Sequence, residues 1–216
     1  MLLMKKVFFF SLLLLTGIAA NAQSEKYVKS MEKLIQAMDT TWNTDRLVEL
    51  SNSFERIADA EKTQWLPYYY AALARVNAGY ALGKNNAAEQ TDPYANKAEE
   101  LINKADALEA NNSEIYVVKK LINTLKLIGD VMGRYMTAGA ASAEALAKAK
   151  SLNPENPRVY LQEGIDKMNT PPQFGGSVEE GKKILEKSLE KFKAFKPASS
   201  IHPQWGESVA QRFLSR

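Results

Sequence analysis

The sequence resembles itself at a fixed spacing of 44 residues, and this repetition limits the folds open to the chain. The matching pairs are Ala98 with Ser142, Ile102 with Leu146, Ala105 with Ala149, Leu108 with Leu152, Ile115 with Val159, and Tyr116 with Tyr160. An earlier aromatic residue, Tyr70, precedes Tyr116 by 46 residues. A period of about 20–50 residues is the signature of structural units that stack on their neighbours. The sequence therefore predicts an array of similar units.

Each unit is expected to consist of helices, because nearly every segment places its apolar residues at helical spacing. We find no convincing strand pattern. The expected helices span residues 24–38, 44–60, 64–82, 93–109, 113–131, 137–151, 157–168, 177–194 and 203–214. The starts at residues 93 and 157 place proline at the first helical position, directly after the capping residues Asp92 and Asn156.

These helices resemble the tetratricopeptide repeat (TPR), in which two antiparallel helices form each unit. The first TPR helix carries an aromatic residue and, four positions later, a small residue, as Tyr160 with Gly164 and Tyr70 with Ala74 do here. The second helix alternates small and large residues and is often followed by proline. The matching residues are Ser142, Leu146, Ala149, Leu152 and Pro154, with Gly181, Leu185 and Ser188 in the last unit. Tyr116 fits as well, but Lys120 stands where a small residue is expected, which puts close helix packing there in doubt.

The resemblance implies an all-α, TPR-like helical-repeat solenoid of antiparallel helix pairs. Small residues would let paired helices approach closely, while the aromatic residues and leucines fill the space between pairs. The clearest units span residues 64–194, and residues 203–214 would form a C-terminal capping helix. The spacing exceeds the usual TPR period of about 34 residues, so helices or loops must be longer here. The alternative is a helical bundle without TPR geometry.

The first 22 residues have the layout of a secretory signal peptide. Lys5 and Lys6 precede an apolar run over residues 7–15, and Ala20-Asn21-Ala22 supplies a cleavage site. A retained membrane anchor is the alternative, although the run is shorter than the roughly 20 apolar residues that a span requires. We predict cleavage after Ala22 in a bacterial cell, which places residues 23–216, a single domain, in the periplasm or outside. The intact mass of the exported protein should lack residues 1–22; a mass that retains them would contradict this prediction.

Composition narrows the chemistry that the exported part can perform. Without the two lysines of the signal, 26 basic residues face 25 acidic ones, a net charge of +1 that does not favour nucleic acid. The chain has no cysteine and one histidine, His202, so we expect no disulfide, no bound metal and no cofactor. The sequence shows neither a serine nucleophile motif nor a phosphate-binding glycine motif, so we expect no enzymatic activity.

Two groups of residues are candidates for binding. Tyr68 and Arg75 lie seven residues apart on one helix face, away from the face of Tyr69 that is expected to be buried. Phe174, Gly175 and Gly176 precede a helix start, where free N–H groups could hold an anion. The alternatives are core packing for the tyrosine run, and a tight turn into a helix capped by Ser177 and Glu180 for the glycines.

These observations favour a non-enzymatic exported module that binds a protein or peptide on a concave helical surface. Residues 170–176, with the small and large residues after them, also resemble a segment of exported bacterial TPR-like proteins, including accessory subunits of solute transporters. The alternative is therefore a small-ligand-binding accessory protein of a periplasmic transport system. One enclosed pocket with convergent polar groups would favour that alternative, and an open groove would favour a protein partner.

Overall fold

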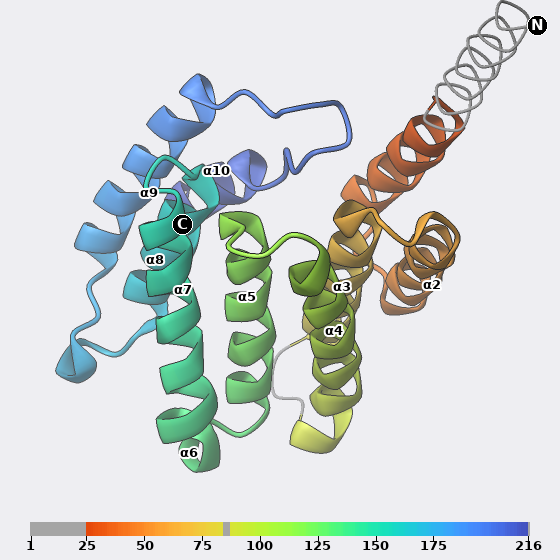
Figure 1. Ribbon diagram of the computed structural model, residues 1–216. Helices are drawn as coiled ribbons and strands as arrows, with labels where there is room; N and C mark the ends of the chain where they lie inside the picture. The colour runs from red at the N-terminus through yellow and green to blue at the C-terminus, as the bar shows by residue number, and fades with distance from the viewer. Residues whose placement is uncertain (1–24, 84–86, 216) are drawn as a thin grey trace, which may run out of the picture.

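The computed structural model describes residues 25–83 and 87–215, and these residues form helices and turns with no strand. The expected all-α class is thereby confirmed, whereas the predicted signal peptide lies outside the described residues. After helical residues 25–39, the elements are α2 (Thr44–Glu61), α3 (Trp65–Ala81), α4 (Ala88–Leu108), α5 (Ser113–Gly129), α6 (Val131–Arg134), the π-helix η1 (Tyr135–Gly139), α7 (Ala140–Leu152), α8 (Pro157–Asn169), the 3₁₀ helix η2 (Pro172–Phe174), α9 (Val178–Ala194) and α10 (Glu207–Leu214) (Figure 1).

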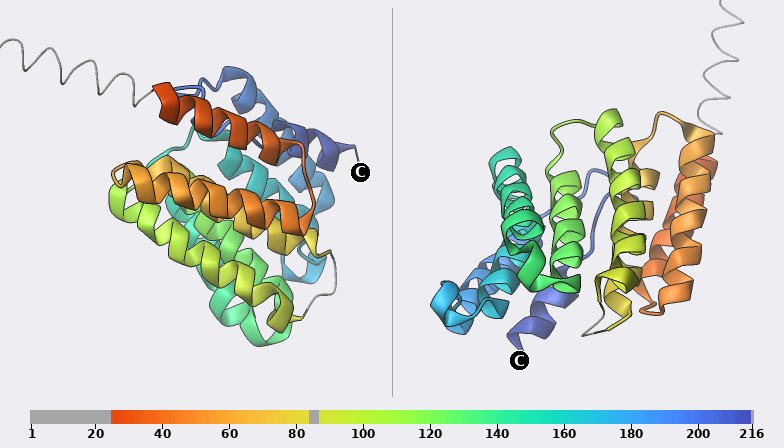
Figure 2. Two further views of the ribbon diagram at one scale, coloured as in Figure 1. Left: turned by 90° about the vertical axis from the view of Figure 1, so that its right-hand side faces the viewer. Right: turned by 90° about the horizontal axis from the view of Figure 1, so that it is seen from below.

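The longer helices pack against their neighbours along the chain. α2 packs on α3, α3 on α4, α4 on α5, α5 on α7, and α8 on α9. Contacts between α3 and α5, and between α5 and α8, link these pairs into a row. In the right-hand view of Figure 2 the helices from α2 to α9 therefore follow one another broadly in chain order, while α10 lies back towards the middle of the array. The helical array is shown by these contacts, while TPR geometry within it stays a prediction.

The spacing of 44 residues is visible in how helices start. Asn112 caps α5 by accepting a hydrogen bond from the N–H of Glu114, and Asn156 caps α8 by accepting one from Arg158, both at 2.9 Å. Each cap satisfies a backbone N–H that has no partner within its own helix. The capping residue and its spacing to the first turn are thus repeated, which confirms the start predicted at Pro157.

Buried serines also recur where helices cross. Ser51 of α2 donates to the Ala71 carbonyl of α3 at 2.9 Å, and Ser188 of α9 donates to the Pro157 carbonyl of α8 at 2.8 Å. Ser142 of α7 approaches the Lys120 carbonyl of α5 at 3.4 Å. A small hydroxyl allows close approach and satisfies its own hydrogen-bonding need. Close packing therefore persists at Lys120, whose ammonium group leaves the crossing to pair with Asp166 of α8 at 2.7 Å.

Two predicted helix starts are wrong. α4 begins at Ala88 instead of residue 93, so Pro93 lies within the helix. The carbonyl that loses its N–H partner belongs to exposed Glu89, where water can replace that bond. The last helix begins at Glu207 instead of residue 203, because Gly206 adopts a left-handed conformation with φ 115° just before it.

The segment between α9 and α10, residues 195–206, forms a C-terminal strap across the array. In Figure 1 it leaves the end of α9, runs towards α3 and returns to α10. Ile201 is buried in the core cluster built mainly from residues of α2 to α5, and the His202 ring lies 6.0 Å from that of Trp65. Trp205 packs against all three core clusters. The strap thereby joins both ends of the helical array.

Candidate functional site

The residues predicted to pack the repeats are buried at the helix contacts or partly buried beside them. Fully or nearly fully buried are Tyr70, Ala74, Ala98, Ile102, Ala105, Ala149, Tyr160, Gly164 and Leu185. Tyr116 and Leu146 are only partly buried and border the second core cluster. At Gly164, α8 and α9 come so close that a β-carbon would lie 3.0 Å from the Gly181 carbonyl oxygen.

A buried polar network joins the starts of α3, α5 and α8. Arg158 has no exposed surface, and its Nε and Nη2 donate to the two carboxylate oxygens of Glu114 at 2.7 and 2.8 Å. Its Nη1 donates to the Trp205 carbonyl at 3.1 Å, and the Trp205 indole donates to the Tyr69 hydroxyl at 2.8 Å. Burial raises the pKa of Tyr69 well above its ordinary value, so this hydroxyl stays neutral. All these groups are engaged with one another, so the network is structural.

Tyr68 and Arg75, the first pair of predicted binding residues, lie along the α2–α3 contact and are partly buried. The Tyr68 hydroxyl donates to Asp59 at 3.0 Å, and Arg75 donates to the Asn52 side chain at 2.7 Å. Both partners belong to α2. The structure therefore brings these two residues to a helix–helix boundary and not to the loop of Phe174.

The glycines after Phe174 form a tight turn. Gly175 has φ 87°, a left-handed conformation that glycine adopts without strain. The N–H of Gly176 donates to Pro171, and that of Ser177 donates to Lys167. Ser177 caps α9 through Glu180 N–H at 3.2 Å, while the Glu180 carboxylate pairs with Lys167 and not with the cap. Because these N–H groups are already bonded, the structure favours the turn over an anion site.

Phe174 itself is 65% exposed and belongs to a group of large apolar side chains at the surface. We name this group the apolar platform; its members are Val131, Met132, Tyr135, Met136 and Phe174. Met132 is 93% exposed and Met136 80%. The rings of Tyr135 and Phe174 lie 6.3 Å apart, centre to centre, so two segments distant in sequence meet here. Exposed apolar groups of this kind mark sites of interaction.

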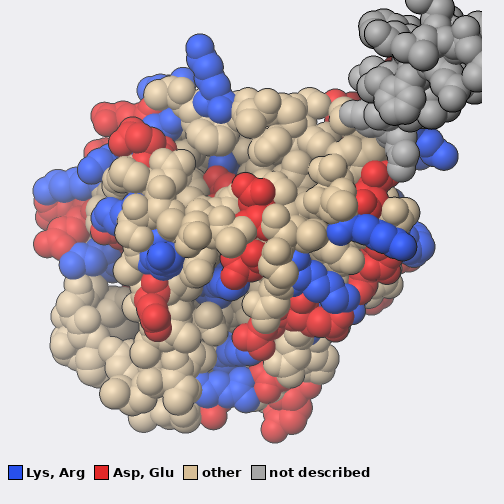
Figure 3. Space-filling model, in the orientation of Figure 1, with Lys and Arg blue, Asp and Glu red and all other residues tan. Residues whose placement is uncertain are grey.

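The platform is visible as an area with few charges. In Figure 3 the lower left carries mostly uncharged atoms, where Figure 1 places α6 and the loop between α8 and α9. Charged side chains cover the neighbouring helices more densely. The α6–η1 segment also departs from regular helix, since η1 is a π-helix of five residues. Such short π-helical turns occur frequently at functional sites.

The sequence reasoning missed the platform apart from Phe174. Residues 132–136 fell between two expected helices and were not considered further. The available signal was a dense group of large apolar residues at the end of one expected helix and in the segment after it: Val131, Met132, Tyr135 and Met136.

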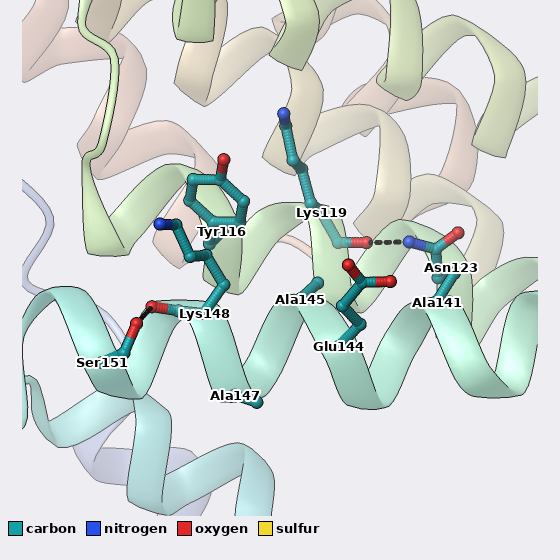
Figure 4. A pocket seen from close by; sticks show the side chains of 9 residues that line it. All are labelled: Tyr116, Lys119, Asn123, Ala141, Glu144, Ala145, Ala147, Lys148 and Ser151. Atoms are coloured by element: carbon teal, nitrogen blue, oxygen red, sulfur yellow. Dashed lines mark hydrogen bonds between the residues drawn. The ribbon is translucent and has the colours of Figure 1, made fainter.

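A hollow, the α5–α7 groove, lies between α5 and α7 and has a volume of about 630 Å³. It is lined by Tyr116, Lys119, Asn123, Ala141, Glu144, Ala145, Ala147, Lys148 and Ser151 (Figure 4). Lys119 is already paired with Asp106 at 2.7 Å, and the Asn123 amide donates to the Lys119 carbonyl. The groove combines alanines with charged groups, so it suits a polar segment better than a flat apolar molecule.

The histidine of the sequence, His202, belongs neither to the α5–α7 groove nor to the apolar platform. His202 lies on the strap, where its Nδ1 is 2.7 Å from the Ser199 hydroxyl, and burial lowers the pKa of the imidazole. Within residues 25–83 and 87–215, no three His, Asp or Glu side chains gather closely enough to hold a metal ion. Among the helices of the described part, none has the length and apolar character to cross a bilayer.

The fold and the platform together define an all-helical protein with an exposed apolar site. Comparison with solved structures finds similarity to the HusA haemophore from Porphyromonas gingivalis, with a TM-score of 0.77 and 29% sequence identity. The match covers 87% of this chain and 90% of that chain. No protein-family model matches the chain, and no curated protein matches it in sequence. The structural neighbour is a binding protein, which favours the small-ligand alternative over the protein-partner prediction.

Proposed function

We propose that this chain is an exported haem-binding protein that holds a porphyrin on its apolar platform. The observation that carries the proposal is the similarity to a haemophore over most of both chains. A haemophore is a carrier of haem, and the similarity covers 87% of this chain. The predicted signal peptide and single-domain organisation agree with this role and remain part of the proposal.

The platform has the chemistry that a porphyrin needs. A porphyrin is a flat, largely apolar ring that water solvates poorly, and burying apolar surface contributes about 25 cal/mol per Å². Tyr135 and Phe174 offer two aromatic faces from separate segments. Met132 and Met136 add flexible, polarizable side chains that adapt to the outline of a ligand.

The described structure offers less support for a protein partner. The starts of α3 and α8, which would contribute to an open inner surface, are bonded to the strap through Trp205, and Glu114 at the start of α5 is paired with Arg158. The α5–α7 groove remains open, but Lys119 pairs with Asp106, and Asn123 and Ser151 donate to the backbone carbonyls of Lys119 and Lys148. A solute-binding role therefore accounts for more of the exposed chemistry.

Replacing Phe174 by alanine is expected to weaken haem binding by about tenfold or more, because the ligand loses contact with one aromatic face. Covering a large apolar side chain is worth about 1.5–3 kcal/mol, and 1.4 kcal/mol corresponds to a factor of ten. Tyr135→Ala should have a comparable effect. The measurement is titration of haem into the protein of residues 23–216, followed by absorbance and by tryptophan quenching.

The matched control is Trp42→Ala, which removes an aromatic side chain that is 63% exposed outside the platform and should leave affinity unchanged. Failure of the wild-type protein to bind haem would refute the proposed function. If Tyr116→Ala abolishes binding while Phe174→Ala does not, the ligand lies in the α5–α7 groove and not on the platform.

A further inference from the structure

One side of the α6–η1 segment carries the platform, and Arg134 ties this segment to another helix. Its Nη1 and Nη2 donate to the two carboxylate oxygens of Asp92 in α4, at 2.6 and 2.8 Å. Nη1 also lies 3.3 Å from the Lys126 carbonyl of α5. Arg134 therefore links α6 to both α4 and α5. The Arg134 side chain is 29% exposed and the Asp92 side chain 28%, so most of each is shielded from water.

The same segment is fixed at its start by Asp130. The Asp130 side chain accepts a hydrogen bond from the N–H of Gly133 at 2.9 Å, and its carbonyl accepts one from the N–H of Arg134 at 3.0 Å. A β-carbon at residue 133 would displace the Asp130 carboxylate, so glycine at this position lets the carboxylate approach the backbone. Polar bonds thus hold the backbone that presents Met132, Tyr135 and Met136 to solvent.

We infer that Arg134, held by Asp92, is a positioning residue that keeps the apolar platform in the arrangement that binds its ligand. The inference rests on the proposed function and adds two residues that do not belong to the apolar surface. Apolar side chains that stay this exposed bury little area against each other, so packing contributes little to their positions, which depend on the backbone beneath them. A site that is ordered before binding avoids an entropic cost at the moment of association.

Arg134→Gln and Asp92→Asn are each expected to weaken haem binding by about 3- to 10-fold, the range set by ordering a few side chains on association. The double variant should bind no more weakly than either single variant, because both act through one pair. Hydrogen exchange of residues 131–139 should speed up in all three variants, while the denaturation midpoint changes little. Arg46→Gln is the control, since it breaks the exposed Arg46–Glu49 pair on α2.

Asp92→Asn separates positioning from direct contact. If Arg134 bound a carboxylate of the ligand itself, releasing it from Asp92 would preserve or raise affinity, while Arg134→Gln would lower it. That outcome overturns the inference, as does wild-type affinity in both single variants. If the wild-type protein binds no haem, the proposed function and the inference both fail. If the wild-type protein binds haem and both single variants bind it equally well, only the inference fails.

Discussion

Replacing Arg158 by alanine is expected to lower the free energy of unfolding by about 3–5 kcal/mol, the cost of leaving a buried charge without its partner. Arg158 is fully buried, and its removal strands the Glu114 carboxylate, which is only 13% exposed. The Trp205 carbonyl loses a donor in the same step. Chemical denaturation of residues 23–216, compared with the wild type, measures the loss.

The double variant Arg158→Met with Glu114→Leu tests the cause. Replacing a buried ion pair by apolar residues of similar volume is often neutral or stabilising, so this variant should recover most of the loss. Lys150→Met, which breaks the half-exposed Lys150–Glu163 pair, should change the free energy of unfolding by less than about 1 kcal/mol. If Lys150→Met and Arg158→Ala lowered the free energy of unfolding by similar amounts, burial of the ion pair would not be the cause of the loss.

Substitution of Gly164 is expected to destabilise the protein even when the new residue is alanine. A β-carbon there would lie 2.7 Å from Cγ of Leu185 and 3.0 Å from the Gly181 carbonyl, so both a branched carbon and a backbone would have to move. Overpacking of this kind costs about 1–3 kcal/mol, and Gly164→Leu should cost more. The gain in helix propensity from glycine to alanine, about 1 kcal/mol, offsets only part of this.

Two alanines of α7 provide the matched control. Ala149 is fully buried, whereas Ala147, two residues earlier, is exposed. Ala149→Leu should therefore shift the denaturation midpoint strongly, and Ala147→Leu should barely shift it. Equal midpoints for wild type, Gly164→Leu and Ala149→Leu would show that neither residue lies at a close contact between helices.

The sequence predicted those features that depend on local chemistry or on the repeat. Asn156 was expected to cap a helix because asparagine before proline satisfies free N–H groups, and the structure confirms it. The helical class followed from apolar spacing alone. Pro93 misled the same reasoning, because α4 begins more than one turn before it and the Glu89 carbonyl that loses its partner is exposed to water.

The platform and the strap had no comparable signal. The approach of Tyr135 to Phe174 depends on how α8 and α9 lie against the turn after α5, which no short motif encodes. Trp205 and Tyr69 are 136 residues apart, so their hydrogen bond could not be expected from spacing within a unit. Of the predicted binding residues, only Phe174 belongs to the platform, while Tyr68 and Arg75 border α2, because a partly exposed helix face can also contact another helix.

The hydrogen bond between Trp205 and Tyr69 changes how a chain of stacked helices can fold. In an open array each unit contacts only its neighbours, so folding can begin anywhere and the ends can fray independently. Here the last residues before α10 complete the core next to α3. This long-range contact raises the contact order and couples the early helices of the array to its last segment. A nascent chain lacks that contact until its final segment has been synthesised. Such a delay would suit the proposed export, because a chain that is still unfolded can cross a membrane.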